Sequence, residues 1–225
     1  MNDASPTASG TICDRVRDDI VAGRLSFGSR LTLDLLAARY SVGHMPVREA
    51  LRQLQGEGLV VLTPNRGARI RTVDVEFVRN VFDLRIAIEA MLARRAAERI
   101  EAPQIARLDA LESELEAAAH ARDYARLLAF NRQFHSTINE AAHNPEAAVV
   151  LERHRDLIAA LWNLYGYGDD RAAGVISDHR HIISALASHD ADVAASLAMA
   201  HAAKAKQALI ARMVAAQSVQ SNAAA

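Results

Sequence analysis

Apolar and polar positions over the first thirty residues repeat with the period of a helix. In "TICDRVRDDIVAGRL", Ile12, Val16 and Ile20 share one stripe. Thr11 and Asp14 precede that stripe at the spacing of a capping box, in which each side chain bonds the other's backbone N–H. The pattern predicts a short amphipathic helix near the N-terminus.

Two more helices and two strands are predicted in the next forty residues. "LDLLAARY" follows Thr32 as a second helix, and "SVGHMPVREALRQLQGEGL" predicts a third. Pro46 fits only a first helical turn, so the third helix should begin near Gly43. "LVVL" and "ARIRTV" flank "TPNRG" and predict two short strands joined by a turn. Three helices and a small hairpin predict a winged helix-turn-helix over residues 11–73.

The rest of the chain consists of successive amphipathic runs, which predict an all-α bundle of about six helices over residues 74–217. Breaks are expected before Pro103, at Asn144-Pro145 and in the loop "YGYGDDRAAG". The last three predicted helices are "EAAVVLERHRDLIAALWNLYG", "VISDHRHIISALASH" and "DVAASLAMAHAAKAKQALIARMV". Residues 1–10 and 218–225 are expected to be a flexible N-terminus and a frayed tail. The predicted fold class is therefore mainly α.

Composition supports helices and limits the cellular setting. Apolar residues make up 51% of the 225 residues and aromatic residues only 4%, and alanine is the strongest helix former. One cysteine, Cys13, excludes an internal disulfide framework and fits a reducing compartment. The start lacks a signal-peptide pattern, and no apolar run reaches the ~18 residues of a membrane span. We expect a soluble, cytoplasmic protein.

Charge is divided unevenly between the two predicted domains. Residues 1–73 hold ten Arg and seven acids, a net of +3, whereas residues 74–225 hold the remaining 16 basic residues and 20 acids, a net of −4. A mildly basic head on an acidic body is typical of a small nucleic-acid module attached to a larger domain.

The third predicted helix carries the candidate DNA contacts. An exposed helix fits the major groove of DNA, and Arg can bond guanine through two hydrogen bonds. Arg48 and Arg52 are free to face outward, and the wing tip with Arg66 and Gly67 can approach the DNA backbone or minor groove. The alternative is a helical domain whose arginines are merely solvated.

Histidines recur on the apolar faces of the predicted body helices. His179 stands at helical spacing from Ile182 and Ile183, and in "AFNRQFHSTINEA" His135 follows Asn131 by one turn. His181, in contrast, is predicted to face outward. Imidazole is the commonest ligand for zinc, nickel and similar ions, although a single buried His is more often a hydrogen-bonded core residue. The inward candidates are His135, His179 and His201, with His154 as a fourth, and periodicity leaves open which three meet.

Arg85 is a cation on an otherwise apolar helix face. It lies at helical spacing from Val81, Phe82 and Ile88, and Glu89 follows it by one turn. A buried Arg needs a partner. An Arg85–Glu89 salt bridge within the helix is the simpler interpretation, and binding of an effector carboxylate is the alternative.

"PVREALRQLQGEGLVVLTPNRGARI" resembles the DNA-binding head of the GntR family of bacterial transcription regulators, over about residues 11–73. The resemblance implies that the first turn of the third helix reads the operator, that Arg52 touches phosphate and that the wing makes a further contact. The implied DNA-binding residues are His44, Met45, Arg48, Arg52, Arg66 and Gly67. The chain departs from the commoner family pattern at Gly43, His44 and Asp34, which predicts a different preferred DNA sequence.

The body resembles the helical FCD ligand-sensing domain of FadR-type members of the same family, through the series F-H…D-H-x-x-I-I-x-A-L…H over about residues 75–215. In metal-binding members an Asp precedes the first His by four residues. The implied ligands are Asn131, His135, His179 and His201, for a divalent ion such as zinc or nickel. Because the amide of Asn131 is neutral, the ion should bind more weakly and favour an anionic effector that completes its coordination.

These features together predict a homodimeric transcription regulator, not an enzyme, that binds a near-palindromic operator in double-stranded DNA and responds to a small organic acid. One alternative is a regulator with a metal-free effector pocket. Another is a metal-dependent hydrolase, in which three histidines activate water. Against the hydrolase, the sequence shows no inward Glu or Asp at a recognisable general-base spacing from the histidines.

Overall fold

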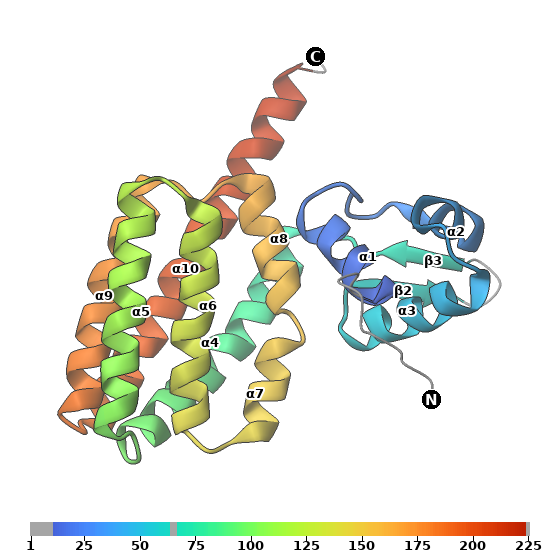
Figure 1. Cartoon of the computed structure of the whole chain (residues 1–225). Coiled ribbons are helices and arrows are strands. Elements are labelled where there is room, and N and C mark those ends of the chain that lie inside the picture. Colours follow the sequence, from blue (N-terminus) through green and yellow to red (C-terminus); the bar gives the residue numbers. More distant parts are fainter. Residues whose placement is uncertain (1–10, 64–66, 224–225) are drawn as a thin grey trace, which may run out of the picture. The chain divides into compact units, whose positions relative to one another are not determined.

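The computed structural model describes residues 11–63 and 67–223. Contacts divide the chain into two units, one comprising Met1–Val73 with Arg153–Leu164 and the other Asp74–Glu152 with Tyr165–Ala225 (Figure 1). We refer to residues 11–73 as the head and to the helices that follow as the body.

The head is a winged helix-turn-helix, as the sequence predicts. The antiparallel sheet has the strand order β1-β3-β2, and Leu62 pairs with Ala68 in the wing. The short strand β1 was not predicted, because two residues are too few to show an alternating pattern. The elements are α1 (Ile12–Val21), β1 (Arg30–Leu31), α2 (Leu33–Tyr40), α3 (His44–Gly56), β2 (Val60–Thr63) and β3 (Gly67–Ile70).

Local caps fix where the helices of the head begin. The predicted capping box between Thr11 and Asp14 is present at the start of α1. The Thr32 hydroxyl accepts a hydrogen bond from the Leu35 N–H at the start of α2, and Gly43 is the N-cap of α3. Side chains on the inner face of α3 are completely or almost completely buried, which leaves its polar face free.

Asp19 ties α1 to α2 at the edge of the head's core. Its carboxylate accepts hydrogen bonds from the guanidinium of Arg24 at 2.6 Å, from Arg39 at 2.7 Å and from the Tyr40 hydroxyl at 2.8 Å. These three bonds lower the pKa of Asp19 even though burial opposes the shift. The head is therefore held together by a paired charge as well as by apolar packing.

The chain after Asp74 is all helical, and it contains seven helices over the residues that the structure describes. They are α4 (Val75–Ala97), α5 (Ala102–His120), α6 (Tyr124–Ala141), α7 (Pro145–Glu152), α8 (Arg155–Tyr165), α9 (Asp169–Ala187) and α10 (Ala191–Ala223). The expected frayed tail falls on the end of α10, which is helical as far as Ala223.

Two helix boundaries differ from the prediction. The single helix expected after Pro145 is two helices, α7 and α8, separated at Arg153 and His154. No Gly or Pro marks that break, so the sequence pattern could not show it. Helix α9 begins at Asp169, inside the predicted loop, because Gly168 takes the N-cap position and two aspartates complement the positive end of the helix dipole.

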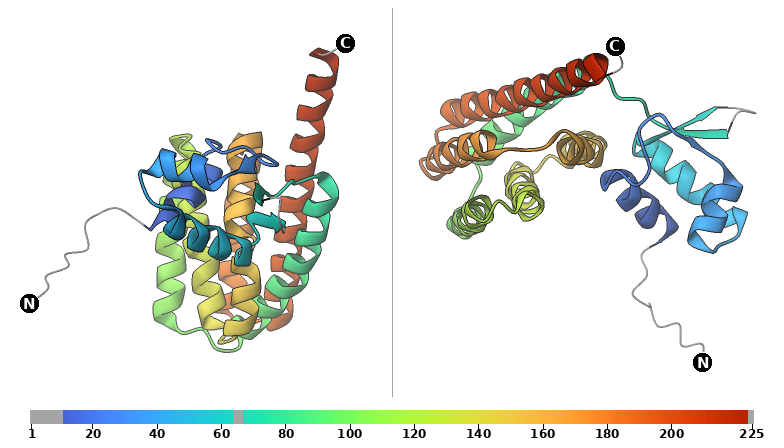
Figure 2. Two further views of the ribbon diagram at one scale, coloured as in Figure 1. Left: turned by 90° about the vertical axis from the view of Figure 1, so that its right-hand side faces the viewer. Right: turned by 90° about the horizontal axis from the view of Figure 1, so that it is seen from above.

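Helix α10 packs along α4, and α5 lies against α6 and α9, as the two views in Figure 2 show. Ion pairs from Arg94 to Asp192 and from Asp83 to Lys206 show that α4 and α10 run antiparallel. Small side chains such as Ala93 let the helices approach closely. Across residues 11–63 and 67–223, every helix is too short or too polar to cross a bilayer.

Candidate metal centre and nucleic-acid interface

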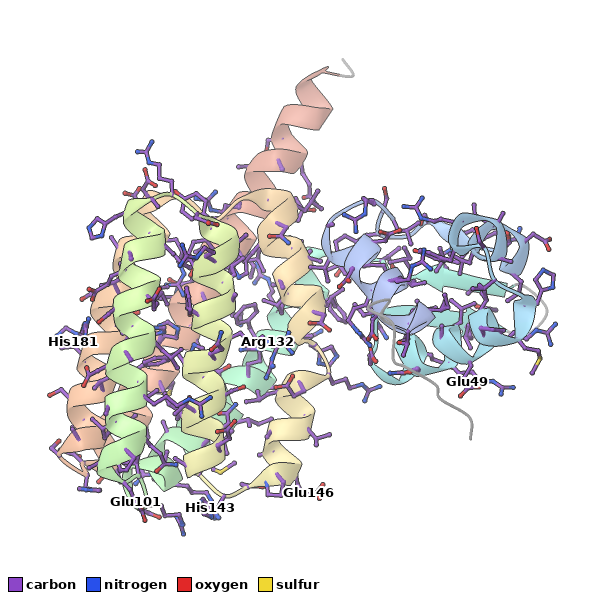
Figure 3. All side chains as sticks on the ribbon, in the orientation of Figure 1. Glu49, Glu101, Arg132, His143, Glu146 and His181 are labelled. Atoms are coloured by element: carbon purple, nitrogen blue, oxygen red, sulfur yellow. The ribbon has the colours of Figure 1, made fainter. Side chains whose placement is uncertain are left out.

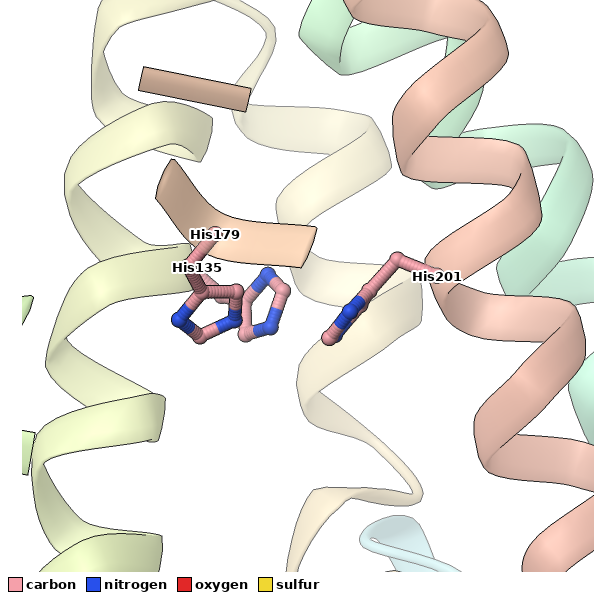
Figure 4. A group of neighbouring side chains, drawn as sticks. All are labelled: His135, His179 and His201. Atoms are coloured by element: carbon pink, nitrogen blue, oxygen red, sulfur yellow. The ribbon is translucent and has the colours of Figure 1, made fainter. Parts of the chain in front are cut away.

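Three histidines from three helices of the body converge on one point. His135 of α6, His179 of α9 and His201 of α10 each offer a ring nitrogen, and these atoms lie within 4.8 Å of one another (Figure 4). His179 is fully buried and His201 is 4% exposed. Of the four inward candidates from the sequence, the structure brings these three together, and His154 is not among them.

His181, two residues from His179, illustrates how helical spacing selects the cluster. It is exposed on the outer side of the bundle, where Figure 3 labels it, and its Nδ1 lies 2.7 Å from the Ser177 carbonyl oxygen. The prediction that it faces outward is confirmed. Position on the helix face, more than residue type, decides which histidine belongs to the cluster.

Asn131 lies one helical turn before His135 on α6, and its Oδ1 is buried without a hydrogen-bond partner among the described residues. An orphaned buried amide oxygen is costly unless something binds it. Oxygen and imidazole nitrogen are both acceptable ligands of divalent ions. The donor set therefore fits a metal ion, with three nitrogens and a neutral oxygen.

An acidic side chain, Glu112 of α5, contacts the ring of His179 at Nδ1. Glu112 Oε2 lies 2.7 Å from His179 Nδ1, and both side chains are fully buried. Glu112 Oε1 and His179 Nε2 have no hydrogen-bond partner in the described part of the chain. This contact corrects the sequence-based expectation that no inward acid stands near the histidines.

The electrostatics of this pair follow from its burial. Burial raises the pKa of the Glu112 carboxyl to about 8, against the opposing effect of Arg180. Burial, with electrostatic contributions from the neighbouring His201, His135 and Arg171, lowers the pKa of His179 well below its usual value. His179 is thus neutral at physiological pH, which is the form of imidazole that binds metal.

Asp178 stands behind the third histidine. Its Oδ2 lies 3.3 Å from His201 Nδ1, and its Oδ1 accepts a hydrogen bond from Lys204 at 2.5 Å. Burial opposes ionisation of Asp178, but the hydrogen bonds from His201 and Lys204 prevail and lower its pKa to about 2. Two of the three imidazoles are therefore in contact with a carboxylate on the side of Nδ1.

Cationic side chains in the body include donors without partners. Arg85 Nη2 lies 2.5 Å from Glu89 Oε1, so the predicted salt bridge within α4 is present. The Nε atoms of Arg85 and Arg171 are nevertheless buried with no hydrogen-bond partner among the described residues. The charge of Arg171 also lowers the pKa of His179, which places this cation within electrostatic reach of the cluster.

In the head, α3 and the wing border a groove of about 730 Å³. Arg48, Arg52, His44 and Gly67 line this groove, and Met45 nearby is 74% exposed. His44 Nε2 lies 2.9 Å from a carboxylate oxygen of Asp34, so two departures from the family pattern contact each other. The predicted wing residue Arg66 lies outside the described residues.

Sequence reasoning missed Glu112, Asp178 and Arg171 as neighbours of the cluster. Glu112 shares the buried stripe of α5 with Leu108 and Leu115, four residues before and three after it. An acid on such a stripe was the available signal, because an unpaired carboxylate is rarely fully buried. No comparable signal in the sequence distinguishes Arg171.

Comparison with protein families matches this architecture over both domains. Residues 8–70 match the model of the bacterial regulatory proteins of the gntR family, and residues 80–204 match the FCD domain. The fold and these matches define a DNA-binding transcription regulator with an effector-binding domain. The chain belongs to the GntR family and carries its FCD domain, as the sequence resemblance indicates.

Individual relatives agree. The chain is 25% identical over 189 residues to the uncharacterized HTH-type transcriptional regulator YdhC of Bacillus subtilis, covering 84% of each chain. It is 27% identical over 177 residues to the HTH-type transcriptional repressor RspR of Escherichia coli, covering 79% of this chain and 78% of RspR. The family matches and the names of these relatives identify the chain as a transcription regulator, so the prediction that it is not an enzyme is confirmed.

Solved structures share the fold at low identity. E. coli McbR/YncC matches with a TM-score of 0.74 and 20% identity, covering 92% of this chain and 96% of McbR/YncC. A GntR regulator from Rhodococcus sp. RHA1 matches with a TM-score of 0.71 and 18% identity, covering 89% of this chain and 96% of that protein. The fold class predicted from the sequence is thereby confirmed.

Proposed function

We propose that the protein is a homodimeric, cytoplasmic transcription regulator whose operator binding responds to a small carboxylate at a metal-containing pocket of the body. The observation that carries this proposal is the meeting of His135, His179 and His201, with ring nitrogens within 4.8 Å. The buried atoms Asn131 Oδ1 and His179 Nε2 support it further. Each can bind a metal ion, and neither has a hydrogen-bond partner among the described residues.

The proposed ligands are His135, His179 and His201, with the Asn131 amide oxygen as a fourth, and zinc or nickel suits such a set. A bound ion would supply a Lewis-acidic position for a carboxylate. The four protein ligands carry no charge of their own when the histidines are neutral. The ion would therefore keep its +2 charge and attract an anion.

The effector is a small organic acid in this proposal. Besides the ion, Arg85 is the proposed cation for it, since its Nε is buried and unpartnered among the described residues even though Nη2 contacts Glu89. Effector binding must differ in affinity between two arrangements of the heads in order to change operator binding.

The proposed DNA contacts lie in the head. Arg48 is exposed on the polar face of α3, where it can bond guanine through two hydrogen bonds. His44 and Met45 occupy the first turn of the same helix and can reach neighbouring base edges. Arg52 is proposed to contact a DNA phosphate. Arg66 and Gly67 are proposed to contact the DNA backbone or the minor groove. Two-fold symmetry of a dimer would require a near-palindromic operator.

Gel-shift titration of the chain against DNA from its own upstream region tests the proposal, with and without chelator and with candidate organic acids. We expect specific, salt-dependent binding that an acid changes only when metal is present. Metal analysis of unchelated protein should show a stoichiometric divalent ion. Specific binding without any metal, and with an unchanged response to acids in chelator, would favour the metal-free effector pocket instead.

A further inference from the structure

We propose that Glu112 is a positioning residue for the metal centre, which holds His179 in the orientation and tautomer that direct its Nε2 at the ion. The inference rests on the metal-containing function proposed above and assigns a role to a residue outside the ligand set. The carboxyl group of Glu112 is not itself a ligand in this proposal, because it contacts the Nδ1 side of the imidazole ring.

The tautomer of His179 decides which of its two ring nitrogens can bind the ion. A neutral imidazole has one protonated and one unprotonated nitrogen, and only the unprotonated one can bind a metal ion. Nδ1 of His179 lies 2.7 Å from Glu112 Oε2. This oxygen can accept a hydrogen bond from a protonated Nδ1. Nε2 is buried and has no partner among the described residues. With the proton on Nδ1, the lone pair of Nε2 is left for the ion.

Two contacts fix the orientation of the His179 ring. Phe134 stacks on the His179 ring with centroids 3.9 Å apart and planes within 6° of parallel. Stacking fixes the plane of the imidazole but still permits a half-turn flip about the Cβ–Cγ bond, which exchanges the positions of Nε2 and Cε1. The flipped ring would lose the hydrogen bond between Nδ1 and Glu112, so the two contacts together hold Nε2 in one direction.

Packing alone does not account for Glu112. Its carboxyl is fully buried, and Oε1 has no hydrogen-bond partner in the described part of the chain. Burying an unsatisfied polar atom is unfavourable. An apolar side chain at this position of the α5 stripe would avoid that cost. A role in positioning His179 explains why this chain has an acid at that position.

His201 offers an internal comparison. Its Nδ1 is 3.3 Å from Asp178, which also binds the exposed Lys204. The shorter Glu112–His179 contact is shared with no other residue that the structure describes. Of the two acids behind the ligands, Glu112 is therefore the one expected to matter more for metal binding.

The test compares Glu112→Met, which removes the acceptor, with Glu112→Gln, whose amide oxygen can still accept from Nδ1. Glu114→Met, an exposed position on the same helix, is the matched control. Affinity for Zn²⁺ and Co²⁺ is measured by chelator competition, and the ligand geometry by the absorption spectrum of the Co²⁺ form. We expect E112M to lose roughly 10–100-fold in affinity, as for other residues behind metal ligands.

E112Q should lose less affinity than E112M and keep the wild-type cobalt spectrum, whereas E112M should change it and E114M should change neither. Equal losses in E112Q and E112M, or an E112M affinity within about threefold of wild type, would overturn the inference. Wild-type protein that binds neither ion would instead refute the metal-containing function. Helix content and thermal unfolding of the metal-free variants check folding, and Glu112→Leu replaces E112M if that variant does not fold.

Discussion

The two candidate sites of this regulator are built in opposite ways. The candidate metal centre of the body is assembled from α6, α9 and α10, with supporting contacts from α5, and its members are largely buried. The groove of the head is formed by short neighbouring elements, and its charged side chains are mostly exposed.

The difference lies in what holds each side chain before a ligand arrives. Ring stacking and a hydrogen bond fix His179 within the body. Arg48 is exposed, has no hydrogen bond or ion pair within the described residues 11–63 and 67–223, and can take the rotamer that a DNA base requires. A buried site such as the histidine cluster selects a ligand by its coordination geometry. An exposed site such as the groove of the head attracts its partner by charge, and its side chains adapt to that partner.

The largest effect is expected from removing one of the proposed metal ligands. His201→Ala should abolish stoichiometric metal binding, because the remaining ligands come from only two helices. Operator binding by the head should persist but lose its response to organic acids. Metal analysis and gel shifts measure the two outcomes, and His181→Ala, on the outer face, is the control. Full metal content in H201A would show that the cluster is not the binding site.

Arg48→Ala tests whether the head reads a DNA base through this side chain. Loss of two hydrogen bonds to a base should cost about 1–3 kcal/mol of specific DNA binding, with metal content unchanged. Gel shifts with operator and with unrelated DNA measure the effect, and Arg107→Ala on the exposed side of α5 is the control. Equal weakening on both DNAs would assign Arg48 to the phosphate backbone.

The pH dependence of stability should separate the two domains. A raised pKa at Glu112 means that the unfolded chain loses its proton first, so stability falls as pH rises from 4.5 to about 8. The lowered pKa of His179 has the opposite effect, but only up to pH 6.5. Between pH 6.5 and 8 the metal-free body should therefore lose about 2 kcal/mol, since one pKa unit is worth about 1.4 kcal/mol.

Denaturant unfolding of chelated protein at several pH values measures this loss, and Glu112→Gln should abolish it. In the head, the lowered pKa of Asp19 stabilises the fold above pH 3.8, and that stability is lost only as pH falls further. Stability of the metal-free chain that stays constant from pH 6.5 to 8 would contradict the assignment to Glu112.

The smallest expected effect is a gain in metal affinity. Asn131→Asp should raise affinity for a divalent ion about tenfold, or 1.4 kcal/mol, because a carboxylate adds charge to the ligand set. The same charge should weaken the response to an acidic effector. Chelator competition measures the affinity, with Asn139→Asp on the same helix as control. Unchanged affinity in N131D would mean that residue 131 does not touch the ion.

The sequence predicted most of the head, because caps, periodicity and turn residues act locally. Thr11, Thr32 and Gly43 mark helix starts where the structure has them. Strand β1 was not predicted, since its pairing with β3 depends on residues almost forty positions away. The break between α7 and α8 escaped because no residue there disfavours a helix.

The candidate metal centre was predictable only in part. Periodicity placed His179 and His201 inward, and the family resemblance selected the set that the structure brings together. Glu112 was missed because its contact with His179 joins residues 67 positions apart. Local pattern shows which face of α5 is buried, but not which helix that face meets.

The spacing of the three histidines along the chain has a consequence for the lifetime of the protein. An ion bound to His135, His179 and His201 would close loops of 44 and 22 residues (179 − 135 and 201 − 179). Such a crosslink restricts the unfolded chain much as a disulfide does, by roughly 3–4 kcal/mol for loops of this length. Unlike a disulfide, such a crosslink would need no oxidising environment, and it would be lost when the ion is scarce. Metal supply would then set how quickly proteases remove the regulator, independently of any effector.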